Sequence, residues 1–268
     1  MRGVRHTAQS FFSKENPVNF VIILEALKFY KSRSARTIQV WFVLLYGINI
    51  LPFILPFVDL NFDAYAQALG DLMKGSLPDG GLTQIMTRGN WIFLGLMVLT
   101  SLISSFFTLM YAVGVVSETD AEQPQHILRR SLASLPRLLL FGLLMAVPAI
   151  LSSCLAFIPL IVFGVMMYFL PLNLALDKLT LTEAMQRSFE STKQRRFFIF
   201  LQIVLLSLLI SLPETLVESL VPGETLPYAF VSTFFVVLRA LVQGRLMGIL
   251  YLLIVKKVQF VLPSKTTD

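Results

Sequence analysis

Six long apolar runs, separated by short polar or basic segments, dominate the pattern of this sequence. Each run approaches or exceeds the roughly 18–20 residues with which a helix crosses a bilayer. The third and fourth runs are nearly continuous, and Pro159 at their junction predicts a tight hairpin, with a long re-entrant arrangement as the alternative. The predicted spans cover roughly Ile38–Val58, Trp91–Val116, Leu138–Phe157, Ile158–Leu176, Phe197–Pro213 and Leu226–Val255.

The composition also indicates a membrane protein. Of the 268 residues, 56% are apolar and 14% are charged, and the mean hydropathy is +0.74. Soluble domains carry about 25% charged residues, and a soluble chain of this length has too little interior to bury six such runs. We therefore expect an all-α, polytopic membrane protein with about six transmembrane helices. Its predicted parts are an N-terminal arm at 1–37, a membrane domain at 38–255 and a tail at 256–268.

Basic residues orient the predicted bundle. Eighteen Lys or Arg residues fall in the two terminal segments and in the connections 117–137 and 177–196, whereas the opposite side has only Lys74 and Arg88. Loops that are rich in Lys and Arg stay in the cytoplasm. We therefore expect the N-terminus and the C-terminus both to be cytoplasmic.

A charged segment at 180–196 interrupts the apolar runs on this basic side. Thr180 and Glu183 fit a capping box, and apolar or small residues recur at helical spacing after them. These residues are Leu181, Ala184, Met185, Ser188, Phe189 and Thr192. The pattern predicts a helix in the cytoplasmic interface, with its apolar face in acyl chains or against the bundle and a solvated loop helix as the alternative. The residues expected to contact anionic lipid are Arg187, Lys193, Arg195 and Arg196.

Similar basic amphipathic segments precede the first and third runs. One begins at Asn16 and Pro17 and carries the apolar stripe Phe20, Ile23, Leu24 and Leu27; the other is HILRRSLASLPRLLL, residues 126–140. The chain thus reads as three parallel repeats of a surface helix and a membrane hairpin. A further amphipathic pattern lies in the outer loop at 62–73, where we expect it to rest on the outer leaflet.

Two arginines, Arg239 and Arg245, lie inside the last apolar run. An arginine within the bilayer costs at least about 2.5 kcal/mol unless it is paired or hydrated. At about 1.5 Å per residue, Arg239 and Glu214 both lie about 25 Å from the inner face, so we expect a structural ion pair between them. Arg245 lies about 16 Å deep, where Asn49 is the nearest polar match. Arg245 is expected to meet Asn49 and backbone carbonyls, a water cavity, or an anion or anionic lipid.

The stretch LPLNLALDKLTLTEAMQRSFESTKQRR, residues 170–196, resembles the signature region of the YciC-like bacterial inner-membrane proteins. It is also similar to the membrane domain attached to some glycerophosphodiester phosphodiesterases. In these proteins a hairpin ends in an apolar-Asp-Lys/Gly turn, and a helix of Ala-x-x-Arg-Ser type and a new span follow. The matching residues are Asp177, Lys178, Ala184, Met185, Arg187 and Ser188, and a final span with an internal arginine, GRLMGILYLLIV, is similar too. The resemblance implies a six-span protein of the bacterial inner membrane, and not the phosphodiesterase activity, because the chain has no room for that catalytic barrel.

Motifs of catalysis and metal binding were sought along the chain without success. It has no Gly-rich phosphate loop, no Gly-x-Ser-x-Gly elbow and no His-Glu-x-x-His. The single cysteine, Cys154, makes neither an internal disulfide nor a metal cluster, and His6 and His126 lie far from any group of carboxylates. We therefore expect no enzyme activity, no cofactor, no metal and no nucleic-acid partner.

These features favour a non-enzymatic integral inner-membrane protein that organises or maintains the cell envelope. Its partners would be membrane lipids, with another membrane protein or a second copy of the chain as further candidates. The alternative is a transporter or permease component that moves an anionic or amphiphilic solute past Arg245. A water-filled cavity that reaches Arg245 would favour transport, and a dry, packed interior would favour the organising role.

Overall fold

The computed structural model describes residues 20–30, 35–75, 85–119, 125–153, 157–177, 179–221 and 225–258. Within these ranges the chain is all-α and has no strand. The helices are α1 (Phe20–Leu27), α2 (Ala35–Ile54), α3 (Asp63–Met73), α5 (Arg88–Thr119), α6 (Gln125–Ser153), α7 (Ile158–Met166), α8 (Leu170–Leu176), α9 (Leu181–Thr192), α10 (Arg196–Glu218) and α11 (Leu226–Ile254). The helix start predicted at Asn16 and Pro17 lies outside the described residues, as do His6, Cys154 and Lys178.

The prediction of six membrane spans is confirmed. Six helical segments are long and apolar enough to cross a membrane, namely Arg36–Ile54, Arg88–Thr119, Ile127–Ile150, Ile158–Leu176, Arg196–Glu218 and Leu226–Ile254. The protein is therefore a multi-pass membrane protein by the length and composition of its helices.

The third span differs from its prediction at its start. The basic segment at 126–137 and the apolar run that begins at Leu138 form one continuous helix, α6, with Pro136 and Pro148 inside it. The residues before Pro136 are mostly Leu, Arg, Ala and Ser, and those Leu, Arg and Ala residues are strong helix formers. No separate surface helix therefore precedes this span among the described residues.

The fourth span is interrupted, which the sequence prediction missed. Helix α7 ends at Met166 and α8 begins at Leu170, with Pro171 in its first turn. A proline ring clashes with the carbonyl of the residue four positions earlier, and proline has no N–H to donate. A helix that continued through Pro171 would place that clash at Met167, so the helix stops and restarts there. We call residues 167–169 the break.

The described chain forms two compact units. Unit 1 takes its described residues from Met1–Ala35, Phe106–Leu209 and Leu241–Asp268, and unit 2 from Arg36–Ser105 and Ile210–Ala240. Helices α5, α10 and α11 each contribute residues to both units. The two units are described separately below.

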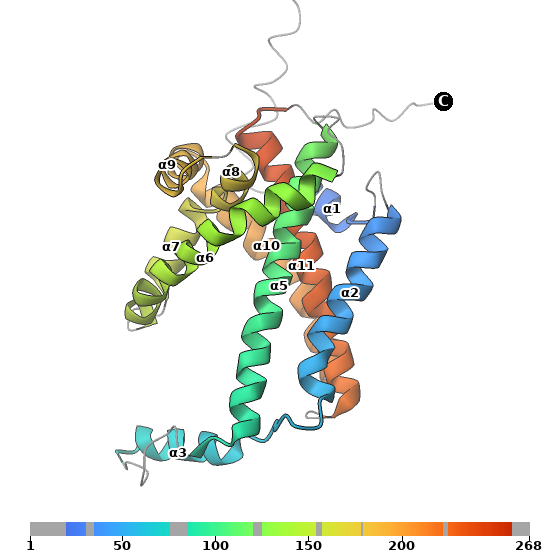
Figure 1. Cartoon of the computed structure of the whole chain (residues 1–268), viewed down its shortest axis with the longest axis vertical. Helices are drawn as coiled ribbons and strands as arrows, with labels where there is room; N and C mark the ends of the chain where they lie inside the picture. Colours follow the sequence, from blue (N-terminus) through green and yellow to red (C-terminus); the bar gives the residue numbers. More distant parts are fainter. Residues whose placement is uncertain are drawn as a thin grey trace, which may run out of the picture. The chain divides into compact units, whose positions relative to one another are not determined.

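In unit 1, helix α6 packs against α7 and α8, and α9 packs against α7 and α8 (Figure 1). Met167, Leu170, Leu174 and Ala184 form a buried apolar cluster between these helices. The ring of Phe169 meets that of Tyr251 edge to face at 5.7 Å, and both side chains are fully buried. This cluster fixes α9 on the two halves of the fourth span.

Helix α11 approaches α5 very closely within unit 1. A Cβ atom built on Gly244 would lie 2.6 Å from the carbonyl oxygen of Thr108, and one on Gly248 would lie 2.8 Å from Cβ of Val115. Glycines four residues apart let two membrane helices bring their backbones together. Any larger side chain at these positions would force the helices apart.

In unit 2, aromatic side chains join α2 to α11. Phe42 meets Phe234 edge to face at 5.6 Å, and the Tyr46 hydroxyl donates to the carbonyl oxygen of Phe230 at 3.1 Å. Asn49 of α2 donates to the Ser104 hydroxyl of α5 at 3.0 Å. In these contacts the Tyr46 hydroxyl and the Asn49 amide each have a hydrogen-bond partner, as polar groups in an apolar environment require.

Candidate functional site

Helix α9 begins with the predicted capping box. The Thr180 hydroxyl accepts from the backbone N–H of Glu183, and the Glu183 carboxylate accepts from the backbone N–H of Thr180 at 2.9 Å. The Thr180 hydroxyl also donates to this carboxylate at 2.7 Å. The bonds that the carboxylate accepts from the Thr180 backbone and then from its hydroxyl lower the pKa of Glu183 below its ordinary value. The reciprocal bonds satisfy donors that a helix start otherwise leaves free, and they fix where α9 begins.

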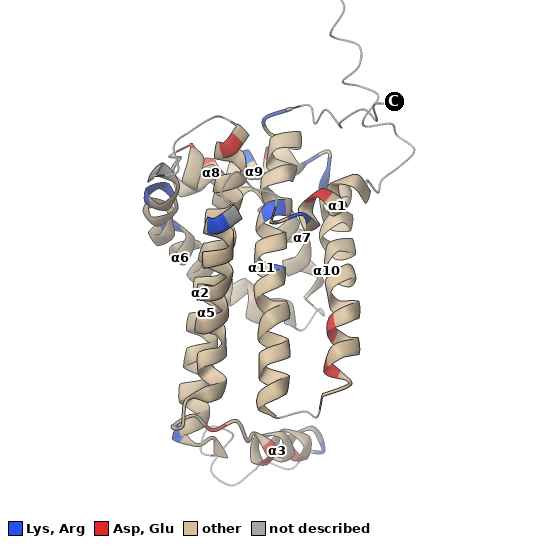
Figure 2. Ribbon diagram, turned by 90° about the vertical axis from the view of Figure 1, so that its right-hand side faces the viewer, with Lys and Arg blue, Asp and Glu red and all other residues tan. Residues whose placement is uncertain are grey.

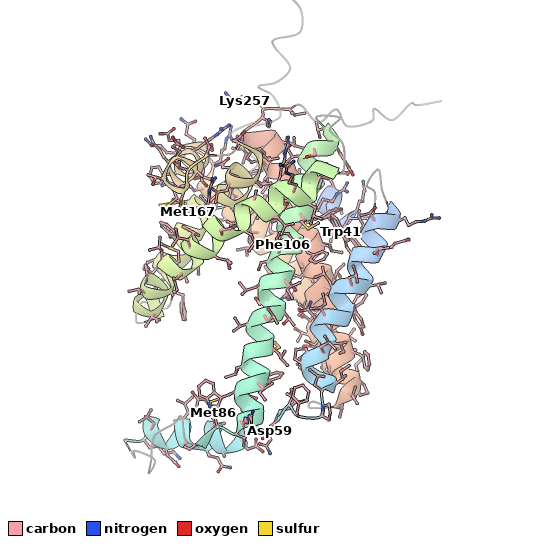
Figure 3. All side chains as sticks on the ribbon, in the orientation of Figure 1. Trp41, Asp59, Met86, Phe106, Met167 and Lys257 are labelled. Atoms are coloured by element: carbon pink, nitrogen blue, oxygen red, sulfur yellow. The ribbon has the colours of Figure 1, made fainter. Side chains whose placement is uncertain are left out.

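Two hydroxyls of α9 satisfy the backbone at the break. Ser188 donates to the Met166 carbonyl oxygen at 2.9 Å and accepts from the N–H of Phe169 at 3.2 Å. Thr192 donates to the same Met166 oxygen at 3.2 Å. Both hydroxyl residues are fully buried beside Met167, which Figure 3 labels. An unsatisfied backbone group in hydrocarbon costs several kcal/mol, so these hydroxyls make the interrupted span tolerable.

Asp177, the residue that follows α8, joins this helix to α9 and α11 within unit 1. Its carboxylate lies 3.1 Å from Nη1 of Arg187 on α9 and accepts from the Tyr251 hydroxyl of α11 at 3.1 Å. Two residues after Asp177, the Leu179 carbonyl oxygen accepts from Arg137 of α6 at 2.6 Å. The motif residues Asp177, Ala184, Arg187 and Ser188 thus hold α9 against the fourth span.

The buried face of α9 is narrower than the sequence pattern suggested. Ala184, Ser188 and Thr192 are buried, and Leu181 and Met185 pack against the cluster, but Phe189 is 40% exposed. The face of α9 lies against α7 and α8 and not wholly in lipid, which is one of the two positions that the pattern allowed. The fold of unit 1 therefore depends on this helix.

The four basic residues predicted to contact lipid have different surroundings. Arg187 forms the ion pair with Asp177, Lys193 is exposed, and Arg195 is half-buried. The guanidinium carbon of Arg196 lies 4.4 Å from the ring centroid of Phe189, in a cation–π contact. Nε and Nη2 of Arg196 are buried and have no hydrogen-bond partner within the described chain.

Arg245 is enclosed by groups that the sequence analysis did not assign to it. Its Nε donates to the carbonyl oxygen of Glu25 at 2.8 Å, Nη1 lies 3.5 Å from the Tyr111 hydroxyl, and Nη2 lies 4.0 Å from the Glu25 carboxylate. Tyr111 in turn donates to the Phe29 carbonyl oxygen. The Arg245 side chain is 12% exposed. Helices α1 and α5 therefore supply the acceptors.

Asn49, the nearest polar match to Arg245 by depth, has partners of its own within unit 2. The Asn49 amide donates to the Leu45 carbonyl oxygen at 2.9 Å and to Ser104 at 3.0 Å. A count along the six predicted spans places no carboxylate at the depth of Arg245, because Glu25 lies in the N-terminal arm outside those spans. Glu25 belongs to that arm, and α1 buries Ile22, Ile23 and Ala26 in unit 1. Apolar burial of α1 brings the carboxylate to the arginine.

Arg239 and Glu214, paired by depth in the sequence, are in contact in unit 2. Nη2 of Arg239 donates to the Glu214 carboxylate and to the Ser211 hydroxyl, the latter at 3.0 Å. Ser211 and Glu214 lie three residues apart on α10 and so share a face of the helix. The contact joins α10 to α11, and it has the character of a structural ion pair.

A polar cluster secures the start of α5 in unit 2. The Asn90 amide donates to the carbonyl oxygens of Asp59 and Asn61, and the Thr87 hydroxyl donates to the Asp59 carboxylate at 2.8 Å. The Thr87 bond, followed by that from the Asn61 backbone, lowers the pKa of Asp59. Asp59 and Met86 lie close together where α5 begins (Figure 3). The cluster ties the segment after α2 to the start of α5, and nothing in it indicates catalysis.

Metal-binding groups of side chains are absent from the part of the chain that the structure describes. No three His, Cys, Asp or Glu side chains there are grouped so that they could hold a metal ion. Charged residues of unit 1 instead lie on α1, α6 and α9 and in the turn after α9, whereas α7 carries none (Figure 2). The candidate functional site is therefore a basic surface, centred on the junction of α9 and α10.

Comparison with family models, with curated proteins and with solved structures gives no match to this chain. The resemblance to the YciC-like proteins accordingly remains a prediction from the sequence.

Several residues that shape the site were missed by the sequence analysis. Glu25 and Tyr111 surround Arg245, and Gly244 and Gly248 allow the close approach beside it. The spacing of the two glycines, four residues apart in an apolar run, was a usable signal of close helix packing. The role of Thr192 had no comparable signal, since a lone threonine on a helix face predicts no particular partner.

Proposed function

We propose that this is a non-enzymatic integral membrane protein of the bacterial inner membrane that organises the envelope by holding anionic lipids. The observation that supports it is the basic excess of unit 1. The described residues of unit 1 include eleven Lys or Arg and five Asp or Glu, whereas those of unit 2 include four and five. Anionic headgroups are attracted to such basic surfaces next to membrane helices.

The exposed apolar residues of unit 1 support a direct lipid contact. Helix α6 exposes Leu143 by 72%, Val147 by 64% and Ile150 by 72%. Helix α1 buries one apolar face and exposes another, with Phe20 63% and Leu24 56% exposed. A basic surface bordered by exposed apolar side chains suits the boundary between headgroups and acyl chains.

The surroundings of Arg245 favour this role over transport past that residue. The sequence analysis took a water-filled path to Arg245 as the sign of a permease. Its guanidinium instead meets Glu25 and Tyr111, and the neighbouring Gly244 and Gly248 are tightly packed against α5. A protein whose internal arginine is held by its own groups fits an organising role better.

A permease component is the second candidate, and one observation favours it. Gln202 of α10 is fully buried, and both polar atoms of its amide have no hydrogen-bond partner within the described chain. A buried amide without partners suits a hydrated or ligand-bearing interior. Uptake of anionic solutes into vesicles that contain the full chain, abolished by Gln202→Leu, would favour the permease over the organising role.

Native mass spectrometry of the full chain tests the proposed function. The protein is released from bilayers that contain equal parts phosphatidylglycerol and phosphatidylcholine. We expect phosphatidylglycerol to be retained about tenfold more often, since charge-assisted contacts are stronger than neutral ones. Equal retention of the two lipids would end the proposal.

Reporter fusions test the proposed orientation separately. Fusions after residues 80, 190 and 268 should report an outside, an inside and an inside position, because the basic connections stay in the cytoplasm. An outside signal at residue 190 would place the basic surface on the wrong side for the anionic cytoplasmic leaflet and would overturn the proposal.

A further inference from the structure

Arg196 stands at the start of α10, where the charged helix α9 gives way to an apolar span. Its guanidinium carbon lies 4.4 Å from the centroid of the Phe189 ring. The ring therefore packs directly against the guanidinium. Such stacking leaves the edges of the group, where its N–H bonds point, available for acceptors.

One edge of this guanidinium has no acceptor. Nε and Nη2 are both buried without a hydrogen-bond partner in the described chain. Their N–H bonds point in parallel, and this is the pair with which arginine binds a carboxylate or a phosphate in two-pronged fashion. Arg196 itself is only half-buried, so its side chain lies at the surface of unit 1.

The neighbouring carboxylates are already engaged. Asp177 is paired with Arg187 and Tyr251, Glu183 is held by Thr180, and Glu190 accepts from Gln186 at 3.0 Å. Among the described residues Arg196 forms no ion pair with a carboxylate. A negatively charged group from outside the chain would complete the site.

Exposed aromatic residues follow Arg196 directly. Phe197 is 67% exposed and Phe200 is 36% exposed, both in the first turns of α10. A free phosphate ion would gain nothing from these rings, whereas the acyl chains of a lipid would cover them. The order of a guanidinium edge followed by exposed phenylalanines matches a lipid with its phosphate above its acyl chains.

We propose that Arg196 binds the phosphate of an anionic lipid through its Nε and Nη2 edge, with Phe189 stacked on the guanidinium and Phe197 and Phe200 along the acyl chains. This inference rests on the proposed function and assigns it a residue. The site distinguishes Arg196 from Arg187, whose guanidinium is held by Asp177.

The test compares variants of the full chain by native mass spectrometry, with phosphatidylglycerol and phosphatidylcholine as probes. Arg196→Lys keeps the charge but removes the two-pronged edge, so we expect about a tenfold loss of phosphatidylglycerol affinity. Lys193→Gln removes one charge from an exposed residue nearby and should lower the affinity less than about threefold. Phe189→Leu keeps Arg196 and should lower it about threefold, through loss of the cation–π contact.

The outcomes separate this site from the proposed function. Unchanged affinity in Arg196→Lys, or an equal loss in Lys193→Gln, would overturn the site and would leave a diffuse basic surface intact. A wild-type protein without preference for phosphatidylglycerol would overturn both. Competition by inorganic phosphate at equal concentration would show that an ion, and not a lipid, occupies the edge. Phe189→Leu with full affinity would likewise contradict the stacked geometry, and it remains informative if Arg196→Lys fails to fold.

Discussion

Arg245 and Arg196 both have largely buried guanidinium nitrogens in unit 1, but the groups around the two guanidinium groups differ. Arg245 has a carbonyl oxygen, a hydroxyl and a carboxylate around it, supplied by α1 and α5. Arg196 has an aromatic face and an edge without a partner. The difference shows that depth in an apolar run does not make an arginine a ligand site. What decides is whether the chain supplies the acceptors itself.

The close packing of α11 on α5 beside Arg245 gives the variant with the largest expected effect. Gly248→Leu places side-chain atoms where Val115 already lies, so we expect a loss of about 3 kcal/mol or more in the free energy of unfolding. The measurement is unfolding of the detergent-solubilised protein followed by far-ultraviolet circular dichroism. Gly164→Leu on α7 is the control, because a Cβ there meets nothing within 4 Å. Equal losses in both variants would contradict the close approach of α5 and α11.

Removal of the Arg245 guanidinium should have the next largest effect. Arg245→Ala leaves Tyr111 and the Glu25 groups without their donor, and we expect a loss of about 2–4 kcal/mol in the free energy of unfolding. Arg245→Met should lose less, about 1 kcal/mol, because a long apolar side chain keeps the packing. Bound phosphatidylglycerol should be unchanged in Arg245→Met. A stable Arg245→Met protein that no longer retains this lipid would make Arg245 the anion site in place of Arg196.

Ser188→Ala tests the satisfaction of the break in the fourth span. The change frees the N–H of Phe169 and removes one of two donors to Met166, so a loss of about 1–3 kcal/mol is expected. Ser191→Ala is the matched control, since Ser191 donates only to the Arg187 carbonyl oxygen within its own helix. Thermal unfolding of the two variants should separate them clearly. A larger loss in the Ser191 variant would mean that the break does not depend on α9.

The smallest effect is expected from the capping box. Hydrogen bonds to the Glu183 carboxylate lower its pKa from the ordinary value of 4.5. A carboxyl with a lowered folded pKa stabilises the native state fully above its unfolded value and loses that contribution as the pH falls through the folded value. Wild type should therefore lose slightly more stability than Glu183→Gln between about pH 5 and pH 3. Thermal midpoints across that range check the direction, and an opposite sign would contradict the capping bonds.

The sequence predicted the parts of the fold that depend on local pattern. Six apolar runs predicted the spans, Thr180 and Glu183 predicted the helix start, and a count along two helices paired Arg239 with Glu214. The neighbours of Arg245 depend on where α1 docks, which no spacing in the chain specifies. Pro171 alone could have predicted the break in the fourth span. The hydroxyl of Ser188, which satisfies the backbone at the break, lies on another helix, and no local pattern predicts that contact. Apart from the Arg239–Glu214 pair, contacts between helices were the part that sequence pattern could not supply.

The break in the fourth span has a consequence for the insertion of the protein into the membrane during its synthesis. Ser188 and Thr192 follow Met166 by 22 and 26 residues in the chain. A ribosome that makes the chain from its N-terminus therefore delivers α7 to the membrane before the hydroxyls that seal its end exist. During that interval the Met166 carbonyl and the Phe169 amide need water or headgroups, because hydrocarbon offers no acceptor or donor. We therefore expect the break to need water or headgroups as partners until α9 has been made.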